Sequence, residues 1–167
     1  MSGQEGAPMK VRLACPKDLP ELLRIYAAAR EAMRRSGNPT QWGNNRPSQE
    51  TLEEDIRLGR LYALEAGEKL VGAFVFFQGP EPSYEAIDGH WLNLEPYSVI
   101  HRIASDGSQR GVLARCLAWC EGQTKNLRID THRDNRVMRH LLEKNGFIPC
   151  GTILAEDGTP RIAYQKA

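Results

Sequence analysis

One run of the chain, from Ser98 to His132, has an order of elements that few folds accommodate. It reads as the apolar strand SVIHRIAS, a polar turn, the helical pattern GVLARCLAWCEGQ and a second strand, NLRIDTH. The helical pattern places its apolar residues on one side, which predicts a helix that packs against a sheet. Two strands joined through such a helix run parallel in one sheet. We therefore expect a mixed α/β fold around this crossover.

The remaining elements fit one domain, because 167 residues are enough for a single core. No linker, repeat or low-complexity stretch divides the chain. We predict a flexible tail over residues 1–9 and one domain over 10–167, with a sheet of about six to seven strands and about four helices. The local signals are a strand at 10–14, N-caps at Asp18 and Ser48, a turn at Ala66–Gly67–Glu68, a polar loop at 80–97 and a closing hairpin at Asp157–Gly158.

Composition excludes several classes of protein. The chain is 41% hydrophobic and 26% charged, and it has no run of about 18 apolar residues, so no membrane span or membrane partner is expected. Its first residues lack an apolar signal core, and we expect a cytoplasmic protein. The four cysteines have no CxxC spacing. Cys116 and Cys120 are one helical turn apart on an apolar helix, which favours buried thiols, and no metal site is predicted.

Charge is distributed unevenly. Residues 101–145 carry a formal charge of +4 and the rest of the chain carries −3. This positive segment suits an anionic ligand, although a solvated helix face would give the same pattern. It contains the turn SDGSQRG, with Gly107 and Gly111, directly before a helix. Unpaired N–H groups at a helix N-terminus hold phosphates, so the turn is a candidate anion site.

The segments RIASDGSQRGVLARCLAWC and LRIDTHRDNRVMRHLLEKNGF, with the order of elements, resemble the GNAT superfamily of acetyl-coenzyme A dependent N-acetyltransferases. The resemblance covers residues 10–166. It is most specific in DNRVMRHLLEKNGF, which is similar to the family's Asn, apolar stretch and Glu-Lys-x-Gly-Phe, and the chain resembles a bacterial subgroup of unassigned substrate. This implies transfer of an acetyl group from acetyl-coenzyme A to a primary amine, on a small molecule or peptide, by direct attack on the thioester.

The resemblance also implies a cofactor site. The two parallel strands would separate, and the backbone of Ile103, Ala104 and Ser105 would bind the pantetheine arm. The pyrophosphate loop would fall on the run Arg110, Gly111, Val112, Leu113, Ala114 and Arg115. Here Leu113 stands where the family has glycine, and Arg115 stands where it has a small residue. We expect Leu113 to turn into the core while the two arginines add charge; the alternative is that Leu113 blocks the cradle. Asn135 matches a family Asn that contacts the cofactor arm, or is a plain helix cap.

The candidate base lies at the end of the second parallel strand. An alkyl amine has a pKa of about 10 and must lose a proton before it attacks. Asp130 and His132 are two residues apart and share a sheet face, so together they are candidates for that base, directly or through water. The alternative is a structural strand-end network, and His101 is a weaker candidate. The family's usual proton donor is a Tyr at a position that is Leu142 here, so another group or water would protonate the leaving thiolate.

Aromatic residues with one carboxylate suit an aminium-bearing acceptor. They are Trp42, Tyr84, Asp88 and Trp91. The alternative is that these tryptophans form a loop core and Asp88–Gly89 is a turn.

Two other functions compete with catalysis. A non-catalytic domain that senses an acyl-coenzyme A or another small ligand would explain the missing Tyr and glycines. Nucleic-acid binding through THRDNRVMRHLLEK is not expected, because its basic residues are interleaved with acidic ones. A homodimer formed through an edge strand is compatible with either of the first two functions.

Overall fold

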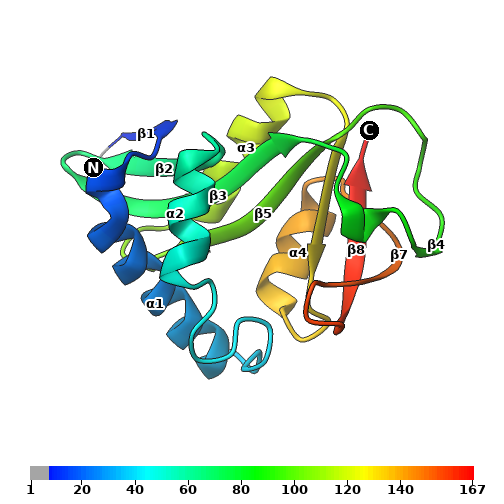
Figure 1. Ribbon diagram of the computed structural model, residues 1–167, viewed down its shortest axis with the longest axis horizontal. Coiled ribbons are helices and arrows are strands. Elements are labelled where there is room, and N and C mark those ends of the chain that lie inside the picture. The colour runs from blue at the N-terminus through cyan, green and yellow to red at the C-terminus, as the bar shows by residue number, and fades with distance from the viewer. Residues whose placement is uncertain (1–7) are drawn as a thin grey trace, which may run out of the picture.

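The computed structural model describes residues 8–167, which form one sheet with two helices on each face (Figure 1). The strand order is β1-β2-β3-β5-β6-β8-β7-β4. The strands are β1 (Met9–Leu13), β2 (Leu61–Ala66), β3 (Lys69–Gln78), β4 (Asp88–Gly89), β5 (Ser98–Ser105), β6 (Leu127–Thr131), β7 (Ile148–Leu154) and β8 (Pro160–Lys166). The helices are α1 (Leu19–Arg35), α2 (Gln49–Arg57), α3 (Val112–Gln123) and α4 (Arg136–Lys144), and short 3-10 turns span Pro16–Asp18 and Pro82–Tyr84.

The predicted α/β class and its parallel central pair are confirmed. The sheet has one more strand than the six to seven expected, because the polar loop contributes the two-residue β4 at one edge. The predicted tail falls mostly outside the described residues, and Met9 already belongs to β1. Across residues 8–167, no helix combines the length and apolar character needed to cross a membrane.

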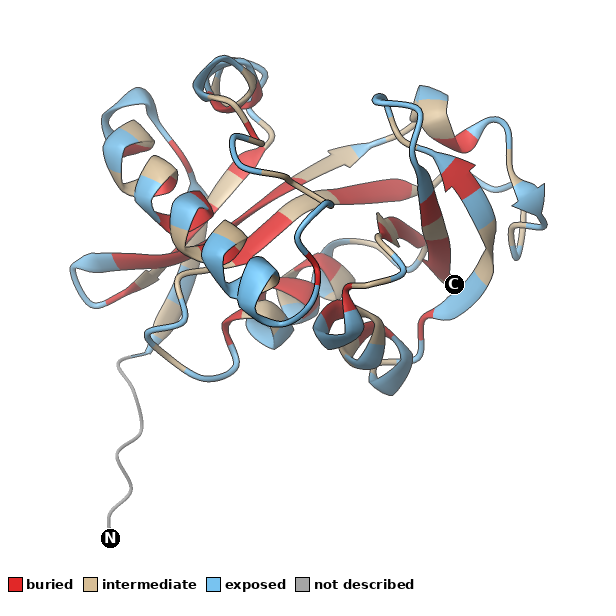
Figure 2. Cartoon of the chain, turned by 90° about the horizontal axis from the view of Figure 1, so that it is seen from below, coloured by how far each residue is buried: buried red, intermediate tan, exposed pale blue. Residues whose placement is uncertain are grey.

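Alternation along the strands divides the core between the two faces of the sheet. Helices α1 and α2 pack on one face, where Ile25 and Leu52 join Ala63 of β2. Helices α3 and α4 pack on the other face, where Leu117 and Leu142 join the strand residues of that side. Figure 2 shows the buried residues concentrated along the strands and on the helix sides that face them.

The two predicted N-caps have different outcomes. Ser48 caps α2, because its Oγ accepts a hydrogen bond from Thr51 N at 3.1 Å. Asp18 occupies the N-cap position of α1 but makes no cap bond. Its carboxylate instead accepts hydrogen bonds from Arg12 Nη1 at 2.7 Å and from Cys15 N at 2.8 Å. The Arg12 guanidinium is the main reason that the pKa of Asp18 falls to about 2.

The parallel pair separates partway along its length, which opens the centre of the sheet. Strands β5 and β6 share three registered pairs, the last of which is Ile100 with Ile129. Beyond that pair, within the described residues, β5 continues beside β3 alone and β6 beside β8 alone. Figure 1 shows the two strands diverging from a common end. Backbone groups that face the gap therefore lack partners in the sheet and are available to a ligand.

Candidate active site

A cavity of about 210 Å³ lies where β5 and β6 separate. Its wall combines residues of both strands with the loop between α1 and α2, the loop after β3 and the β7–β8 hairpin. The polar and charged residues of the wall include Gln41, Arg60, Glu81, His101, Arg102, Asp130, Asn135, Glu156 and Arg161. This convergence of chemically active side chains at an opening of the sheet marks the candidate active site.

His101 lies between two carboxylates in this wall. Its Nε2 is 3.5 Å from Glu81 Oε1, and its Nδ1 is 3.8 Å from Asp130 Oδ1. Asp130 also accepts a hydrogen bond from Tyr84 Oη at 2.6 Å. The proximity of His101 lowers the pKa of Glu81, and burial raises the pKa of Tyr84, so the tyrosine stays a proton donor to Asp130. The imidazole can take up a proton between these groups and pass it on.

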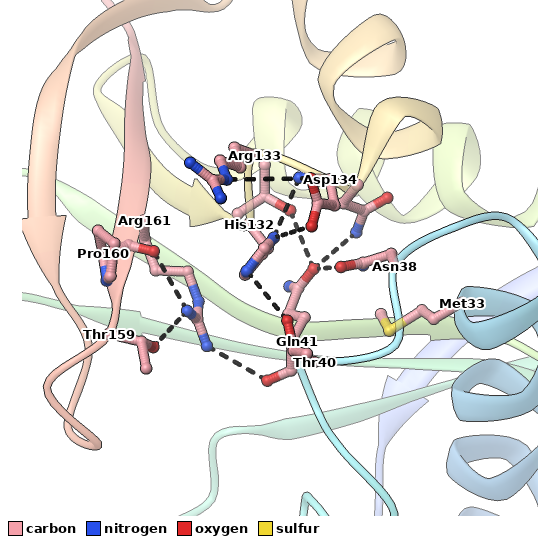
Figure 3. Close-up of polar contacts among 12 residues, drawn as sticks. Met33, Asn38, Thr40, Gln41, His132, Arg133, Asp134, Thr159, Pro160 and Arg161 are labelled. Carbon is pink, nitrogen blue, oxygen red and sulfur yellow. Dashed lines mark hydrogen bonds and ion pairs between the residues drawn. The ribbon is translucent and has the colours of Figure 1, made fainter.

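The expected Asp130–His132 pair is not a contact in the structure. His132 Nε2 lies 3.2 Å from Thr40 Oγ1, and His132 Nδ1 accepts a hydrogen bond from Asp134 N at 3.0 Å (Figure 3). With the Nδ1 lone pair occupied, Nε2 carries the proton of the neutral ring and donates it to Thr40. Burial lowers the pKa of His132, which favours this neutral form. The geometry thus matches the strand-end network, and a base role for His132 stays a prediction without a supporting contact.

Gln41 ties the α1–α2 loop to the end of β6 and the start of α4. Its Oε1 accepts a hydrogen bond from Asn38 Nδ2 at 2.9 Å (Figure 3). It accepts another from Asn135 Nδ2 at 3.0 Å. Asn135 is also the N-cap of α4, because its Oδ1 accepts from Met138 N at 3.1 Å. The cap role of Asn135 is therefore confirmed, while its contact with a cofactor remains a prediction.

The predicted acceptor residues are distributed over three places. Trp42 lines the cavity and packs against the ring of Tyr26. Tyr84 is buried behind Asp130. Trp91 lies outside the wall, with its ring 4.0 Å from the Arg128 guanidinium. Asp88 is exposed in β4 and pairs with β7. Of the four, the structure brings Trp42 to the cavity directly and Tyr84 through Asp130.

The start of α3 fits an anionic group. Gly111 precedes the helix with a φ of 77° and has no side chain to cap it. The first-turn N–H groups of Val112, Leu113 and Ala114 have no acceptor within the helix. Leu113 packs against the core cluster instead of covering these amides, as expected. Arg110 and Arg115 are exposed beside them. Free amides with adjacent positive charge match what a pyrophosphate needs.

The turn also connects directly to the open edge of β5. Ile103 and Ala104 are buried near the end of that strand. Ser105 Oγ accepts a hydrogen bond from Gly107 N at 3.1 Å. The predicted pantetheine contacts and the predicted pyrophosphate loop therefore follow one another along the chain, from the end of β5 to the start of α3.

A buried ion pair that the sequence analysis missed shapes β5 at the cavity. Strand β5 has a β-bulge at this point, because two of its residues, Arg102 and Ile103, lie opposite the single residue Phe74 of β3. Arg102 has a φ of 49°, in the left-handed region. Its guanidinium binds Asp55 of α2, which is fully buried, and its carbonyl accepts a hydrogen bond from Tyr26 Oη at 2.6 Å. An aspartate in the middle of a helix gives no sequence signal for such a role.

Comparison with solved structures identifies the class of protein that this fold and site define. The chain is 30% identical to a GNAT-family acetyltransferase from Streptococcus agalactiae, with a TM-score of 0.85 over 97% of this chain and 96% of the other. A putative acetyltransferase from Staphylococcus aureus is 26% identical, with a TM-score of 0.68 over 93% and 97%. An N-acetyltransferase from the same organism, 20% identical, shares the fold with a TM-score of 0.60 over 95% and 98%.

No protein-family model and no curated protein sequence matches the chain. The similarity to the streptococcal protein extends over nearly all of both chains. The chain belongs to the GNAT family of acetyltransferases.

Proposed function

We propose that this protein is an N-acetyltransferase that moves an acetyl group from acetyl-coenzyme A to a primary amine. The observation that carries the proposal is the separation of β5 and β6 after Ile100 and Ile129, directly over a cavity that contains His101 between two carboxylates. Membership of an acetyltransferase family supports the reaction class.

The residues that would hold the cosubstrate are those of the open edge and the α3 turn. The backbone of Ile103, Ala104 and Ser105 offers hydrogen-bonding groups to an amide-bearing arm. The N–H groups of residues 112–114, with Arg110 and Arg115, offer positive potential to a pyrophosphate. Acetyl-coenzyme A, when bound, supplies an acetyl group activated as a thioester.

We assign the proton transfer to His101. The acceptor amine arrives mostly protonated, so a base must remove one proton before the nitrogen attacks. His101 accepts that proton, and Glu81 and Asp130 stabilise the imidazolium that results. Leu142, at the position of the family's usual proton donor, is fully buried and has no proton to give. Another group or water therefore protonates the departing thiolate.

The proposal is tested by measuring thiol release from acetyl-coenzyme A with a panel of primary amines. We expect turnover with at least one class of amine, and we expect His101→Ala to reduce kcat by about 100-fold. His140→Ala, at an exposed position on α4, is the matched control and keeps wild-type turnover. Equal turnover of His101→Ala and wild type across the pH range would remove His101 as the base.

A binding domain without catalysis is the second candidate function, and the buried Leu142 at the proton-donor position is the observation that favours it. Thermal stabilisation by coenzyme A without acetylation of any amine would support that function instead. A cytoplasmic location and a homodimer remain predictions.

A further inference from the structure

Arg161 is a nearly buried guanidinium in the wall of the candidate active site. Its side chain is 6% exposed, and it lies at the start of β8. Its hydrogen bonds go to neutral oxygens, among them the carbonyl of Gln41 at 3.2 Å and the carbonyl of Pro160 at 3.3 Å (Figure 3). Thr159 Oγ1 is the third acceptor. A guanidinium has more donors than these contacts use.

The charge of Arg161 lacks a carboxylate of its own. Within residues 8–167, the nearest carboxylate oxygen is Oδ2 of Asp157, 3.9 Å from Nη2. That same oxygen pairs more closely with Arg46. Burial lowers the pKa of Arg161, as expected of a cation removed from water with incomplete compensation. A buried cation in this state favours an anionic ligand.

The other two arginines of the wall are engaged elsewhere. Arg60 and Arg102 both donate to the buried carboxylate of Asp55. The carboxylates of Glu81 and Asp130 supply negative charge to the same wall, beside His101. The cavity therefore presents an acidic group of residues and one guanidinium whose carboxylate partner, Asp157, is shared with Arg46.

The register of β6 and β8 gives the position of Arg161 relative to the carboxylate of Asp130. Asp130 pairs with Ala163, so Arg161, two residues along β8, is its diagonal neighbour on the same face of the sheet. Diagonal neighbours across antiparallel strands are roughly 7–8 Å apart. This separation suits a ligand whose positive and negative groups are a few bonds apart. The cavity volume of about 210 Å³ is small beside the usual pockets for drug-sized ligands, and it suits a small acceptor.

We infer that the acceptor is an amine that carries its own carboxylate, an amino acid, with the carboxylate on Arg161 and the amine beside Glu81, His101 and Asp130. The inference rests on the proposed acetyl transfer and specifies its substrate class. A polyamine would bring a second positive charge toward Arg161. A protein N-terminus or lysine side chain would not present a neighbouring carboxylate there.

The test compares matched acceptors with saturating acetyl-coenzyme A: each of several amino acids, its carboxamide and its decarboxylated amine. We expect kcat/KM for the amino acid to exceed that for its carboxamide by about 10- to 100-fold, the usual effect of a charged hydrogen bond. Arg161→Gln should bring this ratio close to one, chiefly through KM for the amino acid. Arg161→Lys should restore the ratio only in part, because lysine keeps the charge but loses the planar fork.

Arg57→Gln is the matched control, because it removes an exposed arginine on α2 that pairs with Glu54 and lies outside the cavity wall. It should keep the wild-type ratio. Equal or better turnover of carboxamides and decarboxylated amines by the wild type would overturn the inference and leave the acetyltransferase proposal standing. Absence of acetylation with every acceptor would overturn both.

Discussion

Asp55 of α2 holds Arg102 of β5 through two hydrogen bonds, one from Nε to Oδ2 at 2.9 Å and one from Nη2 to Oδ1 at 3.0 Å. The pair keeps Arg102 in a left-handed conformation that costs energy for any residue with a side chain. Because Arg102 is in the bulge between His101 and Ile103, this contact sets the direction in which β5 continues after it leaves β6. Helix α2 thereby controls the geometry of the candidate active site.

Asp55→Asn is expected to destabilise the fold by about 3 kcal/mol, since it removes one partner of a buried ion pair and leaves the guanidiniums of Arg102 and Arg60 uncompensated. Urea unfolding measures the loss. Glu54→Gln is the control on the same helix: its exposed pair with Arg57 should leave stability unchanged within error. A stability loss for Asp55→Asn no larger than that of Glu54→Gln would contradict this role.

Gly72→Ala is expected to displace the start of α3. A Cβ at Gly72 would lie 2.5 Å from Val112 Cγ1 and 3.1 Å from the carbonyl oxygen of Ala104, so the Val112 side chain or the start of the helix must move away from β3. We expect a loss of about 1–3 kcal/mol in stability and weaker binding of coenzyme A. Gly122→Ala, in the same helix with open space around it, should instead stabilise by about 0.5 kcal/mol. Scanning calorimetry measures the stability of both variants, and titration calorimetry measures their affinity for coenzyme A. Equal stability and equal affinity in the two variants would argue against close packing at Gly72.

Arg110→Gln and Arg115→Gln should each raise the dissociation constant of coenzyme A by about threefold to tenfold, because each removes an exposed charge beside the α3 amides. The effect should shrink as salt is added, since exposed charges are screened. Titration calorimetry at low and high salt measures both quantities. Arg57→Gln, exposed on α2, should change neither, and a salt-independent loss in the Arg110 or Arg115 variant would point to misfolding instead.

Local patterns were sufficient to predict most elements of the fold. The cap at Ser48, the turn after Ala66 and the strand Ser98–Ser105 depend on neighbouring residues, and all three are confirmed. The partners of the candidate site could not be predicted in this way. Asp55 and Arg102 are 47 residues apart, and Gln41 and Arg161 are 120 apart. Such contacts depend on strand register and loop placement, which no local pattern specifies.

His132 provides a pH test of its structural role. Its pKa lies below the ordinary value of about 6.5, mainly because burial penalises the charged ring. As pH falls, the unfolded chain therefore takes up the proton before the folded chain does. The contribution of neutral His132 to the free energy of unfolding is complete above the ordinary pKa of about 6.5 and is lost as pH falls below it. We expect wild type to lose stability relative to His132→Asn between pH 7.5 and 5.

Asparagine at position 132 keeps an acceptor near Asp134 N, so this variant should also retain turnover within about threefold. Unfolding curves at the two pH values and thiol release give both readouts. A constant stability difference would contradict the buried neutral imidazole, and a loss of turnover of about 100-fold would restore His132 as the base.

The most direct test of the account is a crystal structure of the protein with coenzyme A. We predict that the pantetheine arm lies along the open edge of β5 at residues 103–105 and that the pyrophosphate contacts the N–H groups of residues 112–114, with the Leu113 side chain still packed in the core. A gap between β5 and β6 without ligand, with Leu113 covering the α3 amides, would contradict the proposed acetyltransferase.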